Sequence, residues 1–61
     1  MDKIFSLNKK GFKIKVSTEG SSYVVTATVN NVILDGAGET LEAAIDKCYF
    51  VCMSFLDSIK K

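Results

Sequence analysis

Apolar and polar residues alternate along two stretches of the chain, 12–19 (FKIKVSTE) and 22–29 (SYVVTATV). A period of two residues is typical of a β-strand that buries one face and exposes the other. The residues expected on the buried face are Phe12, Ile14, Val16, Tyr23, Val25, Ala27 and Val29. The two stretches therefore predict a pair of strands that share one apolar face.

The turn between these strands, Gly20–Ser21, predicts how they pair. Glycine in the first position suits a type II′ turn, which closes a hairpin through a two-residue loop. The expected pairs are Val16 with Val25, Ile14 with Ala27, and Phe12 with Val29. This register places apolar residues opposite one another on the same face of the sheet.

A third strand, residues 32–36, is expected after the turn Asn30–Asn31, since asparagine tolerates a positive φ. A two-residue loop there pairs Val29 with Val32 and Ala27 with Leu34. The apolar residues again share one face, so the two hairpins agree with each other.

The first residues of the chain predict a fourth strand over residues 3–8. A four-residue turn at NKKG would set Leu7 against Phe12 and Phe5 against Ile14. The polarity of this strand would then match that of its neighbour.

A helix is expected over residues 41–59. Thr40 is a good N-cap, and the segment GAG at 36–38 is interpreted as a flexible strand-to-helix turn. The apolar residues that form one helical stripe are Leu41, Ala44, Ile45, Cys48, Cys52, Phe55, Leu56 and Ile59. This stripe would pack across the sheet.

These elements predict an α+β fold, an antiparallel β-meander of three to four strands packed against one C-terminal α-helix. The whole chain, residues 1–61, is expected to be a single domain, 48% hydrophobic and 25% charged. A domain of this size buries only about 60% of its unfolded surface, so its stability is marginal and association would increase it. A homodimer is the simplest such association.

Phe50 lies nearly opposite the centre of the apolar stripe, where a helix on a sheet should be polar. Tyr49 and Met53 lie close enough on the helix to form a patch with it. We predict that this patch is an interface, either in a homodimer or with a foreign protein.

Charge is distributed unevenly, with a basic first part and an acidic helix, although the net charge is only +1. The acidic helix residues Glu42, Asp46 and Asp57 predict contact with a basic surface on a partner protein. The alternative is nucleic-acid binding by the basic hairpin residues Lys9, Lys10, Lys13 and Lys15. All eight basic residues are lysine. Nucleic-acid binding is therefore disfavoured, because lysine lacks the guanidinium fork that reads guanine or clamps phosphate.

The sequence offers no catalytic or metal-binding constellation, so we expect a protein that is not an enzyme and holds no cofactor. It contains no histidine, and only two cysteines, Cys48 and Cys52, which lie four residues apart. We interpret these cysteines as reduced core residues, which favours a cytoplasmic location. No run of eighteen apolar residues and no signal peptide is evident, and neither membrane insertion nor export is expected.

The segment STEGSSYVVTATVNNVILDGAGETLEAAIDKCYFVCMSFL resembles the HicB-like family of antitoxin domains. The matching residues are Glu19, Gly20, Tyr23, Val24, Val25, Gly38, Glu39, Thr40, Leu41, Glu42 and Ala44. The resemblance covers about residues 12–56 and implies a degraded RNase H-like sheet and helix that neutralises a toxin, for example an RNA-processing nuclease. TVNNV replaces the PDLPG segment of the family, and no DNA-binding second domain is expected.

Two other comparisons remain open. Small phage proteins that inhibit a host enzyme often pair a short sheet with one helix, and the size and acidic helix of this chain suit that role. The order of strands, glycine and helix is also similar to the second half of a double-stranded RNA-binding domain. That module has lysines where this helix begins with Glu39 and Glu42, so RNA binding ranks third.

Overall fold

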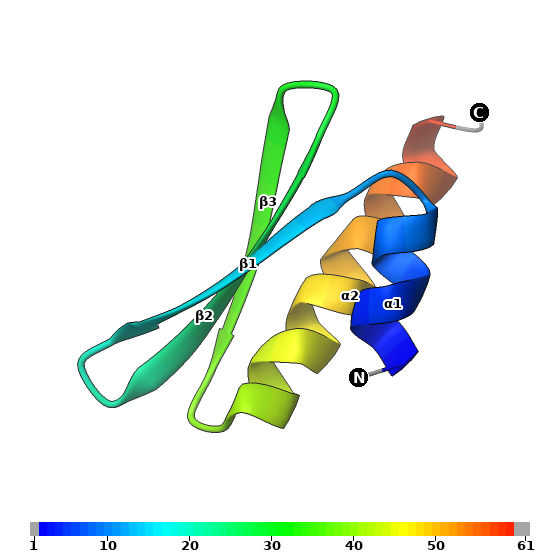
Figure 1. The fold of residues 1–61 in the computed structure, drawn as a ribbon. Helices are drawn as coiled ribbons and strands as arrows, with labels where there is room; N and C mark the ends of the chain where they lie inside the picture. Colours follow the sequence, from blue (N-terminus) through cyan, green and yellow to red (C-terminus); the bar gives the residue numbers. More distant parts are fainter. Residues whose placement is uncertain (1, 60–61) are drawn as a thin grey trace.

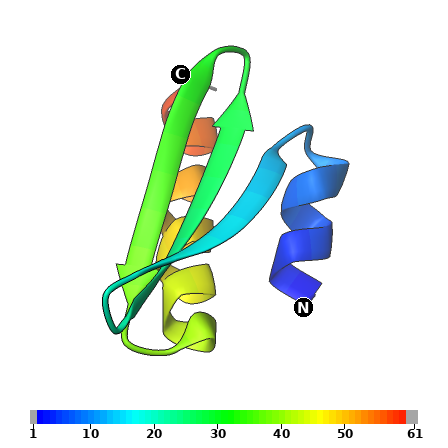
Figure 2. The same ribbon diagram turned by 60° about the vertical axis from the view of Figure 1, so that its left-hand side comes forward.

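A computed structural model describes residues 2–59, which form two helices and three strands (Figure 1). The elements are α1 (Asp2–Lys9), β1 (Lys13–Glu19), β2 (Ser22–Val29), β3 (Val32–Gly38) and α2 (Leu41–Ile59). The strands form an antiparallel sheet in the order β1-β2-β3. Helix α2 packs on β2 and β3, while α1 lies beside α2 and next to β1 (Figures 1 and 2). The α+β class and the C-terminal helix are confirmed.

The register of the first hairpin is confirmed. Val16 is opposite Val25 and Ile14 is opposite Ala27. Gly20 has a φ of +63°, as the first position of a type II′ turn requires. The ladder between β1 and β2 ends at the pair of Lys13 with Thr28, so Phe12 lies one residue before it.

The second hairpin also has the expected register. Val29 is opposite Val32, and Ala27 is opposite Leu34. Asn30 and Asn31 both have positive φ, 49° and 67°. Two successive positive φ values define a type I′ turn, whose twist matches that of the flanking strands.

The predicted fourth strand over residues 3–8 is wrong, because this segment is helix α1. Ile4 and Leu7 are three residues apart, so one face of a helix can turn both toward the core. Phe5 therefore does not pair with Ile14 but lies exposed on α1. Leu7 and Phe12 do lie together in the core, as predicted. The end of helix α1 joins them, however, and not the turn of a hairpin.

Strand β3 continues through the GAG segment, which corrects the interpretation of this segment as a flexible turn. Gly36 pairs with Val25, and Gly38 pairs with Tyr23. A Cβ atom on Gly36 would overlap the backbone of Cys48, and one on Gly38 would lie 2.8 Å from the Ala44 nitrogen. The glycines allow α2 to lie directly on β3.

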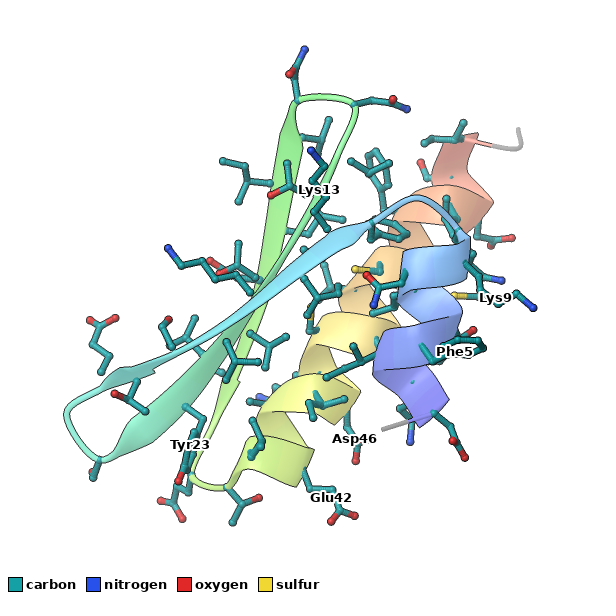
Figure 3. All side chains as sticks on the ribbon, viewed as in Figure 1. Phe5, Lys9, Lys13, Tyr23, Glu42 and Asp46 are labelled. Carbon is teal, nitrogen blue, oxygen red and sulfur yellow. The ribbon has the colours of Figure 1, made fainter. Side chains whose placement is uncertain are left out.

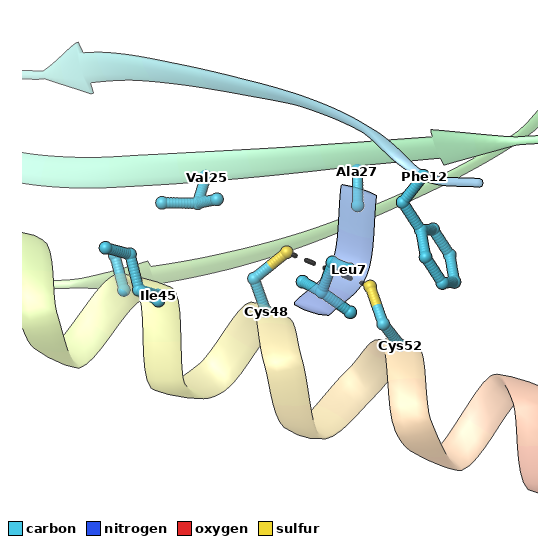
Figure 4. Packing of buried hydrophobic residues seen from close by; sticks show 8 residues of the cluster. Leu7, Phe12, Val25, Ala27, Ile45, Cys48 and Cys52 are labelled. Atoms are coloured by element: carbon cyan, nitrogen blue, oxygen red, sulfur yellow. Dashed lines mark hydrogen bonds between the residues drawn. The ribbon is translucent and has the colours of Figure 1, made fainter. Parts of the chain in front are cut away.

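Helix α2 has the predicted bounds and the predicted cap. The Thr40 side-chain oxygen accepts a hydrogen bond from the Ala43 N–H at 3.1 Å. The buried core, seen from close by in Figure 4, consists of Leu7, Phe12, Val25, Ala27, Ala44, Ile45, Cys48 and Cys52. Ile59, which we placed in the core stripe, is 60% exposed, because it is the last residue of the helix.

Tyr23 corrects a second core prediction. Tyr23 lies on the same side of β2 as Val25, but it is 36% exposed. Val16, also expected on the buried face, is 46% exposed. Figure 1 shows that the hairpin of β1 and β2 extends past the helices, so its inner face near the tip lacks cover. Strands of a sheet twist, so their ends move away from a straight helix that packs on the centre of the sheet.

Neither helix within residues 2–59 combines the length and apolar character needed to cross a bilayer.

Candidate protein-binding surface

The outer face of α2 carries an exposed aromatic side chain, as predicted. Phe50 is 73% exposed. Asp46 lies one helical turn before it and Asp57 two turns after it, and both are exposed. The ring is thus an apolar protrusion with carboxylates along the same face.

Helix α1 covers one flank of this face. The Lys3 ammonium lies 2.9 Å from a carboxylate oxygen of Asp46 and 6.0 Å from the centroid of the Tyr49 ring. The hydrogen bond to Asp46, followed by the charge of that carboxylate, raises the pKa of Lys3. Tyr49 is half-buried and packs against the core. Asp46 and Tyr49 therefore already make intramolecular contacts with Lys3, and the sequence analysis did not predict these contacts.

A groove of about 480 Å³ lies between the first turns of the two helices. Its lining residues are Asp2, Lys3, Leu41, Glu42, Ile45 and Asp46. Figure 3 shows Glu42 and Asp46 projecting from the first turns of α2. This end of the surface is rich in carboxylates, with one lysine already paired.

A second groove of about 440 Å³ lies at the other end of α2. Its lining residues are Lys10, Met53, Leu56, Asp57 and Ile59. Met53 is half-buried, whereas Asp57 is exposed. The groove thus has apolar lining residues and one charge of each sign, a composition that suits the binding of a protein side chain.

The structure thus divides the six predicted residues of the partner-binding site. Glu42 and Asp46 line the first groove, Met53 and Asp57 line the second, and Phe50 protrudes from the same helix. Tyr49 lies beside α1.

Sequence reasoning missed two residues near this surface, Lys3 and Phe5, because it assigned them to a strand. Phe5 is 65% exposed, and the Lys9 ammonium lies 5.5 Å from its ring centroid. The helical spacing of Ile4 and Leu7 could have predicted helix α1 and, with it, the positions of Lys3 and Phe5.

The four lysines of the alternative nucleic-acid site do not form one patch. Lys9 is in the last turn of α1 and Lys10 follows it, whereas Lys13 and Lys15 project from β1. The strand alternation that buries Ile14 toward the helices turns these two lysines to the opposite face. Figure 3 shows Lys9 beside Phe5 and Lys13 over the sheet.

The two cysteines are buried and free, with 4.0 Å between their sulfur atoms (Figure 4). Burial raises the pKa of the Cys48 thiol, and burial together with Cys48 raises the pKa of Cys52 to about 12. Such thiols stay protonated at neutral pH and are poor nucleophiles and metal ligands. Within residues 2–59, no cluster of three histidine, cysteine or acidic side chains is placed to hold a metal ion.

Comparisons with protein-family models, with curated proteins and with solved structures find no match for this chain. The resemblance to HicB-like antitoxins therefore stays a prediction from sequence.

Proposed function

We propose that this protein is a non-catalytic, antitoxin-like binding module that neutralises or inhibits a partner protein through the outer face of α2. The observation that carries the proposal is the 73% exposure of Phe50 in a row with Asp46 and Asp57. Exposed aromatic side chains with a polar surround are typical of the residues that dominate protein–protein binding. A small phage-type inhibitor of a host enzyme is an alternative with the same surface.

The acidic character of this face favours a basic partner. A two-fold homodimer through Phe50 would bring the carboxylates of Asp46 and Asp57 near those of the second copy. A basic protein surface, such as that of a nuclease, would instead complement them. We place this interaction in the cytoplasm, where the buried thiols Cys48 and Cys52 would stay reduced.

The experiment requires a matched pair of variants. Phe50→Glu removes the protruding ring from α2, and Phe5→Glu removes a ring of similar exposure from α1. Tagged protein would be used to isolate partners from its native cells, and each partner would be purified and titrated by calorimetry. We expect Phe50→Glu to weaken binding at least tenfold, while Phe5→Glu binds like the parent. Both variants should melt at the parental temperature, because neither ring is buried.

Equal binding by Phe50→Glu and the parent would refute the assignment of this surface. Sedimentation of the free protein tests the homodimer, since a dimer that Phe50→Glu dissociates would make the second copy the occupant. Titration with generic RNA and DNA tests the lysine alternative. Binding to phosphates through Lys9, Lys10, Lys13 and Lys15 would fall steeply with salt, whereas no binding at low salt would exclude it.

A further inference from the structure

Strand β3 forms an edge of the sheet, and its register shows which of its backbone groups face outward. The two-residue loop Asn30–Asn31 closes on Val29 and Val32, which form a hydrogen-bonded pair. Bonded and non-bonded pairs alternate along an antiparallel ladder. Val32, Leu34, Gly36 and Gly38 therefore bond to β2, and the backbone groups of Ile33, Asp35 and Ala37 face away from it. Within residues 2–59, no other backbone segment bonds to these three residues.

The two edges of the sheet differ in their protection. The β1 edge carries Lys13 and Lys15, and α1 lies next to it. Lysine on an edge strand opposes pairing with another strand. Strand β3 has neither lysine nor proline, its one charged residue is Asp35, and Ile33 is 68% exposed. The β3 edge is thus open to a further strand.

One flank of α2 lies along this open edge. The backbone around Lys47 and Cys48 directly faces Gly36. Val51 lies one helical turn further on and is half-buried, and Phe55 follows one turn after it. A strand added to β3 would place its inward side chains against Val51 and Phe55.

We propose that the β3 edge binds an extended segment of a partner protein as a fourth strand. The outward backbone groups of Ile33, Asp35 and Ala37 would supply the hydrogen bonds. A basic side chain of the segment would lie next to Asp35, and alternating apolar side chains would cover Val51 and Phe55.

A second copy of this chain fits the edge less well. Paired strands lie about 4.8 Å apart, whereas packed helices need about 8–10 Å between their axes. Since α2 lies directly on β3, two β3 strands paired around a two-fold axis would bring their helices too close. Pairing centred on Asp35 would also oppose two carboxylates. An extended segment without a helix packed on it, and with a basic residue opposite Asp35, avoids both the helix overlap and the charge repulsion.

This inference goes beyond the proposed function, because it concerns the sheet edge rather than the outer face of α2. The probe is a synthetic nine-residue peptide that alternates valine with threonine and carries one central lysine. Amide hydrogen exchange by NMR is followed with and without the peptide. We expect at least tenfold slower exchange at Ile33, Asp35 and Ala37, and no change at Ile14, Val16 and Thr18 on the β1 edge.

One pair of variants and one further variant sharpen the test. Ala37→Pro removes an outward N–H from β3 without breaking the ladder to β2, and Val16→Pro does the same on β1. We expect at least tenfold weaker peptide binding in the first and parental binding in the second. Asp35→Lys leaves the backbone unchanged. This variant should bind the lysine peptide tenfold more weakly and should instead bind a peptide with a central glutamate.

Three results would overturn the proposal. The first is peptide binding without slower exchange at the β3 amides, and the second is parental binding by both Ala37→Pro and Asp35→Lys. The third is protection of Ile33, Asp35 and Ala37 in the free protein that increases with its concentration, which would identify a second copy as the occupant. None of these results depends on Phe50.

Discussion

The backbone N–H of Phe12 donates a hydrogen bond to the Leu7 carbonyl over 3.1 Å, and both side chains are buried in one cluster. The N–H of Gly11 donates to the Asn8 carbonyl, also at 3.1 Å. Together the two bonds form a Schellman motif, which ends a helix with a residue of positive φ and an apolar contact across the turn. This motif joins α1 to the start of β1 and directs Phe12 into the core.

Gly11→Ala should lower the free energy of unfolding by about 1–2 kcal/mol, because an L-residue resists a positive φ. Gly11 has a φ of +99°, and a Cβ atom there would meet nothing within 4 Å. The loss would therefore come from backbone conformation and not from a clash. Chemical denaturation measures it, with Lys10→Ala as the control in the same turn. Equal stability of the two variants would contradict this account of the helix end.

The two hairpins could be predicted because several independent signals coincide there. The alternation in β1 and β2, the glycine at Gly20 and the asparagines of the second turn all require the same register. Residues 3–8 carry no such agreement, since Ile4 and Leu7 fit a helix and Phe5 and Leu7 fit a strand. The structure has the helix, which ends in the Schellman motif with its local apolar contact between Leu7 and Phe12.

The candidate site could be predicted only where the pattern within one helix is sufficient. The helical wheel alone places Phe50 away from the sheet, and it is exposed. The environment of Asp46 and Tyr49 depends on Lys3, which reaches them only because α1 is a helix. The sequence pattern could not provide that contact once α1 was assigned as a strand.

Val25→Asp should unfold the domain, because it places a carboxylate at the fully buried centre of the inner face. A buried charge without a partner costs several kcal/mol, which is comparable to the whole stability of a small domain. Val24→Asp is the matched control, since the neighbouring residue projects from the opposite face and is only half-buried. Circular dichroism melts would compare the two. A cooperative melt of Val25→Asp at the parental temperature would contradict the register.

Gly36→Ala should destabilise the protein by about 1–3 kcal/mol, as expected for overpacking. The added methyl group would overlap the backbone of Cys48, which cannot move without shifting α2. Ala37→Val adds volume to the next residue, which is exposed on the other face, and should change stability little. Urea titration of both variants would separate steric conflict with α2 from a general effect of bulk in β3. Similar midpoints would mean that α2 does not contact β3 so closely.

The buried thiols predict a loss of stability at alkaline pH. Burial raises the pKa of Cys52 from an ordinary value of 9.0 to about 12, and it also raises that of Cys48. In the unfolded chain these thiols lose their protons near pH 9, while in the folded protein they keep them. The stabilisation is therefore complete below pH 9 and is lost as the pH rises from 9 toward 12. Cys52 contributes a slope of up to about 1.4 kcal/mol per pH unit in that window, and the raised pKa of Cys48 adds a slope of the same sign above pH 9.

Replacing both cysteines with alanine isolates this effect, because every other residue of the chain stays in place. The double variant should be less stable at pH 7, since alanine leaves small cavities where Cys48 and Cys52 are fully buried. Its free energy of unfolding should nevertheless fall less as the pH rises above 9.0, the ordinary pKa of the thiols. Urea titrations at several pH values measure both slopes under reducing conditions, which prevent oxidation. Parallel slopes for parent and variant would mean that the two thiols ionise equally well in the folded and unfolded chains, and that water reaches them in the core.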